Sequence, residues 1–435
     1  MSVVPGSLDT DSQPPMTIPL RHFVASLGLL VAGAGLGVLA ASTPSLRLAH
    51  VHLVLAGWVC ITIAGAMTQF VPVWFGVSLH SKRLARLQLP LLLVGLLGLA
   101  SSLGLGLYAL APAFGAVALV GFWTFAYNVG RTLFRARPLD ATGRHFAFAL
   151  ACLLAVTVLG VLLALDFTRP LLGAARPRVV AAHATLAVFG AVLGTVAGAA
   201  YQLVTMFTQT DVEGVGARLK RAETVGYPVG VAALAAGRLL GVEALAAAGG
   251  ALVAGGLLAL GAVLLRRLYA ARVPTTPMLR RYAVVGVALL AWGALTLPAW
   301  VADPLAPAAR FGAPGPTHLL LFGAVGFVVV GTLYHVVPFV VWVHRYSDLL
   351  GLEDVPMIDD LYDARVARVD FALTLAGGGA VVAAEAFALP APALQAGGAV
   401  ALAGFCLFAA NLLLVLRRHA PQSVGELLRG AAAGR

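Results

Sequence analysis

Long apolar stretches alternate with short polar, basic or Pro-rich segments along almost the whole chain. A helix that crosses a bilayer needs about 20 apolar residues, because it must span the hydrocarbon core at about 1.5 Å per residue. The pattern predicts twelve such helices and leaves no room for a second, soluble domain. The predicted ranges are 20–41, 48–75, 88–107, 109–130, 145–166, 179–207, 224–240, 244–265, 281–301, 317–343, 369–389 and 394–416.

The composition supports an all-α integral membrane protein, because 60% of the residues are hydrophobic and only 11% are charged. Residues 1–19 are polar and Pro-rich, and they lack the basic start and cleavage site of a signal peptide, so we expect a disordered leader. A membrane domain at 20–419 and a C-terminal tail at 420–435 would follow. Cys60, Cys152 and Cys406 fall inside predicted helices without CxxC spacing and are expected to be packing residues.

The net charge of +11 raises the question of a nucleic-acid partner. If the N-terminus is cytoplasmic, 23 of the 29 Lys and Arg residues fall at the cytoplasmic ends of the predicted helices. This distribution predicts that both termini are cytoplasmic, which requires an even number of spans. We therefore expect the lipid bilayer of the plasma membrane as partner and no nucleic acid. The six basic residues on the outer side are Arg47, Arg169, Arg176, Arg178, Arg238 and Arg310.

One apolar stretch occurs three times at a fixed offset of 133 residues. The copies begin at Ala49 (AHVHLVLAGWVCITIAGAMTQFVP), Ala182 (AHATLAVFGAVLGTVAGAAYQLVT) and Gly315 (GPTHLLLFGAVGFVVVGTLYHVVP). Eleven of 24 positions are identical between the first two copies, and no gap is needed. A weaker repeat (RHF at 21–23, RHF at 144–146 and RRY at 280–282) marks the helix before each copy. The chain is therefore expected to form three pseudo-symmetric four-helix units, at 20–137, 141–272 and 277–419.

Glycines recur at two columns of this repeat and form a small-residue stripe on one side of the helix. The simpler explanation is close helix packing, which small residues permit in lipid. The alternative is that the stripe leaves room for a flat cofactor. The two columns are Gly57, Gly190 and Gly323, and Gly65, Gly198 and Gly331.

Histidines gather at the outer starts of the second, sixth and tenth predicted helices. They are His50, His52, His183 and His318. A single histidine there could simply contact headgroups and water, but four at three equivalent helix starts favour a shared site, and imidazole commonly ligates haem iron, copper and zinc. His50 and His52 lie about 200° apart on a helix, so we expect them to serve sites on opposite sides.

A second polar band lies about 26 Å deeper, at Thr68-Gln69, Tyr201-Gln202 and Tyr334-His335. His335 is a second candidate metal ligand beside His183, although a hydrogen bond within the bundle is the simpler expectation for it. His22 and His145 share a helix-start pattern with arginine and are expected to anchor at the inner interface.

This architecture resembles subunit I of the haem-copper oxidases. The pattern of His50, His52, Gly57, Trp58, Gly65 and Pro72 is similar to the HxH helix of cbb3-type oxidases and their nitric oxide reductase relatives. It also resembles the NnrS proteins, twelve-helix relatives that bind haem and copper. The resemblance implies a b-type haem held by His50 or His52 with His318, a copper ligand at His183, and a redox partner subunit or cytochrome.

Several departures limit what the resemblance implies. The seventh predicted helix contains no histidine, so the paired copper ligands of the oxidases are missing, and the HxH motif lies on the second helix instead of the tenth. Tyr201 lies too far from His183 for a cross-linked pair, and Glu385 is the only carboxylate expected well inside a span. Oxygen reduction by the ordinary mechanism is therefore not expected.

The leading hypothesis is a membrane protein that binds haem, with copper as a second candidate. Its role would be electron transfer, nitric oxide chemistry or the handling of haem or metal, and any enzymatic activity would be that of a haem-dependent oxidoreductase. A secondary transporter is the main alternative, because internal repeats are common there, although usually in other arrangements. A structural subunit that has lost its cofactors is the third.

Overall fold

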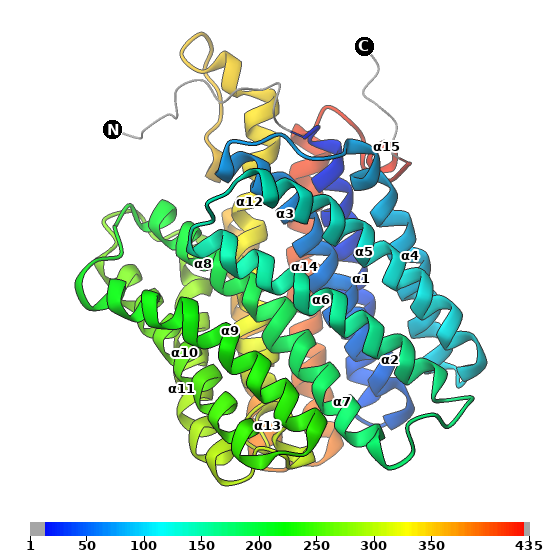
Figure 1. Ribbon diagram of the computed structural model, residues 1–435. Helices are drawn as coiled ribbons and strands as arrows, with labels where there is room; N and C mark the ends of the chain where they lie inside the picture. Colours follow the sequence, from blue (N-terminus) through cyan, green and yellow to red (C-terminus); the bar gives the residue numbers. More distant parts are fainter. Residues whose placement is uncertain (1–13, 430–435) are drawn as a thin grey trace.

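The computed structural model describes residues 14–429 and is helical throughout, with no β-strand among these residues (Figure 1). Eleven helices in this range are long and apolar enough to cross a membrane. The chain is therefore an integral membrane protein built from helices. One long helix of the described range falls outside the eleven: α9 (Gly214–Leu240), which carries four basic residues and Glu223.

The first third of the chain begins with α1 (Thr17–Ala40). A broken helix follows, made of η1 (Pro44–Leu46), α2 (Arg47–Val51), η2 (His52–Val59) and α3 (Cys60–Phe75). After it come α4 (Lys82–Gly104), η3 (Tyr108–Leu110) and α5 (Ala111–Arg135).

The second third repeats this order. It contains α6 (Ala141–Leu165), η4 (Gly173–Ala175), α7 (Arg176–Thr185), η5 (Leu186–Val192), α8 (Leu193–Thr208), α9 and α10 (Glu243–Ala270). The last third contains α11 (Pro277–Ala302), η6 (Pro307–Ala309), η7 (Leu319–Gly326), α12 (Phe327–Arg345), α13 (Ala364–Ala386), α14 (Ala391–His419) and α15 (Val424–Arg429).

Side chains at the helix starts fix several of these boundaries. Ser81 and Thr276 accept hydrogen bonds from backbone N–H groups three residues later, at the starts of α4 and α11. Asp140 and Asp363 do the same for α6 and α13. Such caps satisfy N–H groups that have no partner inside the helix, so the short polar segments of the sequence act as helix start signals.

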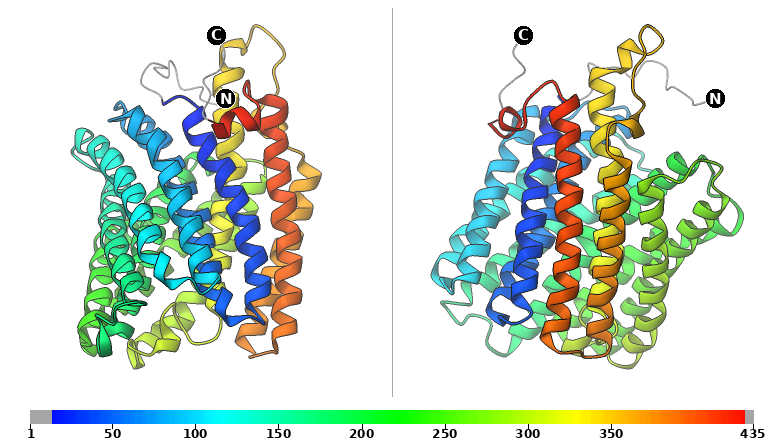
Figure 2. Two further views of the ribbon diagram at one scale, coloured as in Figure 1. Left: turned by 90° about the vertical axis from the view of Figure 1, so that its right-hand side faces the viewer. Right: turned by 180° about the vertical axis from the view of Figure 1, so that it is seen from behind.

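The same helix contacts recur in each third of the chain. The first helix of each third packs on the broken helix that follows it (α1 on α3, α6 on α8, α11 on α12), and the third and fourth helices pair (α4 with α5, α9 with α10, α13 with α14). α1 also packs against α14, so the first and last long helices lie side by side (Figure 2). We call the end of the bundle where α1 starts the proximal end, and the opposite end, where the broken helices start, the distal end.

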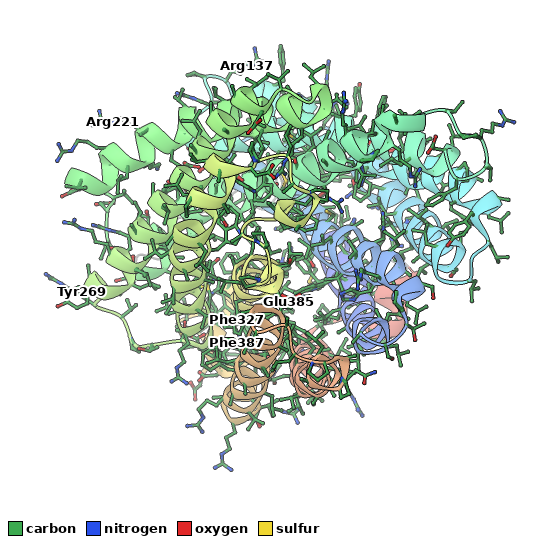
Figure 3. The ribbon with its side chains drawn as sticks, turned by 90° about the horizontal axis from the view of Figure 1, so that it is seen from below. Arg137, Arg221, Tyr269, Phe327, Glu385 and Phe387 are labelled. Carbon is green, nitrogen blue, oxygen red and sulfur yellow. The ribbon has the colours of Figure 1, made fainter. Side chains whose placement is uncertain are left out.

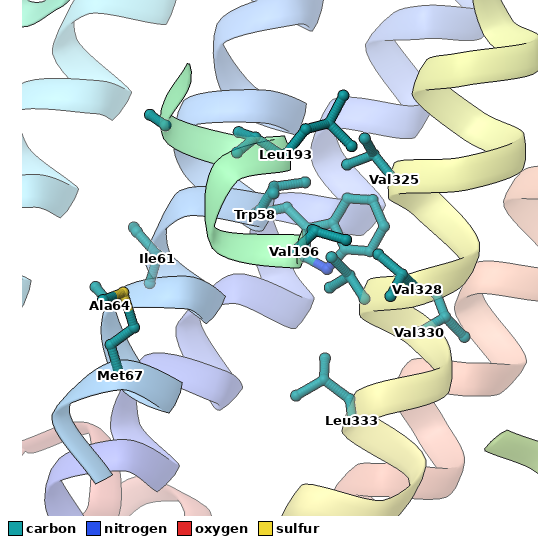
Figure 4. Close-up of a cluster of buried hydrophobic side chains, with 14 of the residues drawn as sticks. Trp58, Ile61, Ala64, Met67, Leu193, Val196, Val325, Val328, Val330 and Leu333 are labelled. Atoms are coloured by element: carbon teal, nitrogen blue, oxygen red, sulfur yellow. The ribbon is translucent and has the colours of Figure 1, made fainter. Parts of the chain in front are cut away.

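Each broken helix contains a π-helical segment at the same place in the repeat. The segments are η2, η5 and η7, each seven or eight residues long. π-helical turns are rare and often mark functional sites. Here each follows directly on the histidine positions of the repeat. Apolar side chains at the ends of these segments or just beyond them meet in one buried cluster, with Trp58 and Ile61 from the first copy, Val196 from the second and Val328 from the third (Figure 4).

The repeated glycines make close contacts with the first helix of each third. A methyl group on Gly65, Gly198 or Gly331 would lie 2.7, 2.8 or 3.1 Å from the Cβ of His22, His145 or Arg281. The other column faces Leu29, Cys152 and Ala288 in the same way. Each set of contacts is equivalent in the repeat, so packing explains the glycine stripe and these positions leave no space for a cofactor.

Four predicted boundaries need correction. The leader was expected to reach residue 19, but α1 begins at Thr17 because residues 17–19 are already apolar enough to join the bundle, and residues 1–13 lie outside the described residues. The predicted tail 420–435 contains α15, and residues 430–435 are likewise outside the described range. The charged seventh and eleventh helices begin ten and five residues earlier than hydropathy suggested, at Gly214 and Ala364.

Candidate functional site

The four histidines of the repeat share one hydrogen-bonding arrangement at the distal end. Nδ1 of His50 lies 2.8 Å from the carbonyl of Gly33, and Nδ1 of His183 lies 3.0 Å from that of Val156. Nδ1 of His52 lies 2.8 Å from the carbonyl of Leu48 on its own helix. Nδ1 of His318 lies 2.6 Å from Oε1 of Glu385.

These partners fix which ring nitrogen carries the proton. A carbonyl oxygen only accepts hydrogen bonds, so Nδ1 of His50, His52 and His183 must be the donor, and Nε2 of the neutral ring then keeps its lone pair. Within residues 14–429, no hydrogen bond engages Nε2 of any of the four. Metal-bound histidines show this arrangement, in which one nitrogen donates to a carbonyl or carboxylate and the other ligates.

Glu385 holds His318 at two points. Its Oε1 accepts from the ring and its Oε2 accepts from the backbone N–H of His318 at 2.9 Å. Figure 3 looks onto the distal end and labels Glu385 beside the helix that begins at residue 319. Glu385 lies in the last turn of α13, so the prediction of a carboxylate well inside a span was wrong for this residue.

Two of these histidines occupy matching surroundings in different thirds of the chain. His50 and His183 are equivalent in the 133-residue repeat, and their acceptors Gly33 and Val156 are equivalent in the preceding helices. A methyl group on Gly37 would lie 2.6 Å from the His50 ring, and one on Gly160, its equivalent, 3.2 Å from the His183 ring. Small residues at these positions therefore let each ring approach the neighbouring helix.

The histidines of different helices lie within electrostatic range of one another in two combinations. A positive charge on His318 would oppose one on His50, and a positive charge on His52 would oppose one on His183, and we call these combinations the histidine pairs. His50 therefore lies against Gly33 of α1, whereas His52 lies toward His183 of α7. Each pair joins the second position of one copy of the repeat (50 or 183) to the fourth position of another copy (318 or 52).

The third pairing of the repeat carries no histidine. Its positions are Thr185 and Pro316. The Thr185 hydroxyl instead accepts a hydrogen bond of 2.8 Å from Arg238, a buried residue of α9 that also donates to three backbone carbonyls. An arginine thus takes the place of an imidazole pair at this interface.

His335 does not join the other histidines. It lies in the second half of α12, whereas His183 lies on α7 at the distal end, so the two candidate metal ligands are not brought together. The hydrogen bond expected for His335 is absent among the described residues. The ring instead packs against Phe207 and Phe339, with centroids 4.3 and 5.7 Å away. No group of three or more His, Cys, Asp or Glu gathers within residues 14–429.

A second set of polar contacts repeats near the proximal end. His22 contacts Gln88, whose amide also reaches Thr68. In the next third, His145 lies 3.1 Å from Glu223, which interacts electrostatically with Tyr201.

In the last third, the equivalent contact is an ion pair between an arginine and an aspartate. Arg281 forms a completely buried ion pair with Asp370, and Tyr334 donates to the same carboxylate. We call the three sets proximal triads. Each takes one residue from the first helix of its third, one from the broken helix and one from the helix that follows.

The proximal triads correct two predictions. His22 and His145 do not lie at the interface, because they are 1% and 0% exposed. Hydropathy placed Glu223 just before the seventh predicted helix and Asp370 at the start of the eleventh. Both carboxylates are instead buried in the helix bundle. No sequence signal identified Gln88, Glu223 and Asp370 as equivalent, because their separations of 135 and 147 residues differ from the fixed offset of the repeat.

A cavity of about 80 Å³ lies between the three broken helices. Its lining is almost entirely apolar and includes Met67, Leu203 and Val329, one from each copy of the repeat. This volume suits a few small molecules and is too small for a macrocycle.

Comparison with known proteins adds no relative. No protein-family model matches the chain, and no curated protein matches it significantly.

Proposed function

We propose that this protein binds b-type haem through the histidine pairs His50/His318 and His52/His183, and that its role is electron transfer in the membrane. The observation that carries the proposal is the shared state of the four rings. Each has Nδ1 engaged by an oxygen acceptor and Nε2 without a hydrogen-bond partner among the described residues, and the four are distributed as the two histidine pairs.

The donor set fits haem iron. Haem needs one or two axial ligands from the protein, and two neutral imidazoles are a suitable pair. A bound haem would supply a centre that accepts and releases one electron. The carboxylate of Glu385 would hold His318 in position and make it a stronger donor, while the Gly33 and Val156 carbonyls would orient His50 and His183.

Paired histidines favour electron transfer over chemistry at the iron. If both histidines of a pair held one haem, the group would supply electron transfer rather than binding of oxygen or nitric oxide. Copper at His183 would need further ligands, and His335 lies too far away to be one, so copper binding remains a prediction without structural support.

We also propose that α9 crosses the membrane, which gives twelve spans in three pseudo-symmetric units with both termini cytoplasmic. Support comes from the helix contacts that recur in each third, and from 23 of 29 basic residues at the proximal side. A redox partner, a cytochrome or another subunit, would then dock at one face of the bundle.

Single histidine substitutions test the haem proposal. We expect His50→Ala and His318→Ala to remove the same part of the haem absorption of the purified protein, and His52→Ala and His183→Ala to remove the other part. His344→Ala is the control, because its Nδ1 also contacts the carbonyl four residues earlier, at 2.9 Å, but at the proximal end of α12. Equal loss in all five variants, or no loss in any, would refute the assignment.

A further inference from the structure

A pocket rich in arginine opens at the distal end, at the interface without histidines. It has a volume of about 280 Å³ and lies between the start of α7, the end of α9 and the loop before η7. Three arginines line it: Arg178, Arg238 and Arg310. They are half of the six basic residues that lie on this side of the chain.

The three charges have no acidic partner. The four ion pairs within residues 14–429 involve none of these arginines. Asp303, the acidic residue of the loop between α11 and η7, accepts instead from the backbone N–H groups of Leu305 and Ala306. Arg238 is 3% exposed, so its charge is held away from water with only neutral oxygens as acceptors.

The positive charges of neighbouring arginines also destabilise one another. The charges of Arg238 and Arg310 repel, and Nε of Arg310 is buried without a hydrogen-bond partner among the described residues. Burial lowers the pKa of Arg310. Gathering like charges in a partly buried pocket is costly unless a counter-charge is bound there.

A glycine lets the backbone lie close to one of these arginines. Gly241 ends α9 with φ +74°, and the guanidinium of Arg178 lies 3.3 Å from where its Cβ would be. A side chain there would be strained and would press on Arg178. Guanidinium groups are suited to oxyanions, because their planar N–H donors bind two oxygens at once.

We propose that this pocket binds a phosphate group, held by Arg178 and Arg310 with Arg238 behind them. The group could be inorganic phosphate or the headgroup of an anionic lipid in the same leaflet. The pocket does not depend on haem binding at the histidine pairs.

Two measurements distinguish the sources. The first is calorimetric titration of the purified protein in detergent with inorganic phosphate, at constant ionic strength set with chloride. The second is native mass spectrometry after reconstitution with phosphatidylglycerol, which reports retained lipid. Saturable 1:1 binding in the first assay indicates the free anion, and one retained lipid in the second indicates the headgroup.

Matched variants decide whether the pocket is responsible. We expect Arg178→Gln and Arg310→Gln to weaken the observed binding by about tenfold or more, because each removes charge-assisted hydrogen bonds. Arg169→Gln, on the same side but outside the pocket, should change nothing. Absence of binding in both assays, or equal weakening by the Arg169 control, would overturn the proposal.

Discussion

At the residue scale, His318 is held in place by hydrogen bonds to a carboxylate from a distant part of the chain. Its ring and its backbone N–H both depend on Glu385, which comes from a helix 67 residues further along the chain. The sequence predicted His318 as a candidate ligand from the repeat alone. It could not predict the partner, because Glu385 and His318 are related only by the packing of α13 against η7.

Glu385→Gln tests this dependence. An amide keeps the size of the side chain but weakens the hydrogen bond to Nδ1, so we expect weaker haem retention and a raised reduction potential at the His50/His318 pair. The other pair should be unchanged. A redox titration of the purified variant measures both, and an unaltered potential at both centres would show that Glu385 has no part in the site.

The buried pair of Arg281 and Asp370 gives a second prediction at this scale. Asp370→Asn leaves the guanidinium buried without a counter-charge, so thermal unfolding in detergent should show a loss of about 3–5 kcal/mol. The double variant Arg281→His/Asp370→Gln introduces the residue types found at His22 and Gln88. It should be less destabilised than Asp370→Asn alone, and a larger loss in the double variant would contradict the equivalence of the proximal triads.

At the scale of helices, the repeat determines where helices cross. The glycine columns identified from the sequence mark close contacts between helices. The side chain of the neighbouring helix that each glycine contacts favours packing over a cofactor pocket as their explanation. Gly198 illustrates this, because a methyl group there would lie 2.8 Å from the Cβ of His145 and 3.2 Å from the Phe146 ring.

Gly198→Ala should therefore destabilise the protein by about 1–3 kcal/mol, as expected for overpacking of a close helix contact. Gly255→Ala in α10 is the matched control, because nothing lies within 4 Å of the added methyl group. Its effect should stay within about 1 kcal/mol. Thermal unfolding of both variants is the measurement, and equal effects would mean that the α6–α8 contact is not tight in solution.

At the scale of the whole molecule, hydropathy and the repeat together predicted an integral membrane protein of helices, and this is confirmed. The ends of the charged helices were predicted less well. α9 begins at Gly214 although its first turns contain charged residues such as Lys220 and Glu223. Such residues are tolerated where they reach the proximal surface or a buried partner. Mean hydropathy along the sequence does not register these surroundings. The hydrogen bonds of the distal histidines and the proximal triads depend on how the helices pack in three dimensions.

Cysteine labelling tests whether α9 crosses the membrane. In a background without native cysteines, Glu213→Cys, Val242→Cys and Arg272→Cys place one thiol before α9, one between α9 and α10, and one after α10. We expect a membrane-impermeant maleimide to reach positions 213 and 272 from one side and position 242 from the other. Labelling of 213 and 242 from the same side would contradict a twelve-span topology.

The haem content of the purified protein tests the central claim most directly. We expect oxidised and dithionite-reduced absorption spectra of a six-coordinate b-type haem, and about two haems per chain, one for each histidine pair. The double variant His50→Ala/His52→Ala should retain neither. A featureless spectrum of correctly folded wild-type protein, isolated from cells supplied with haem, would contradict the account.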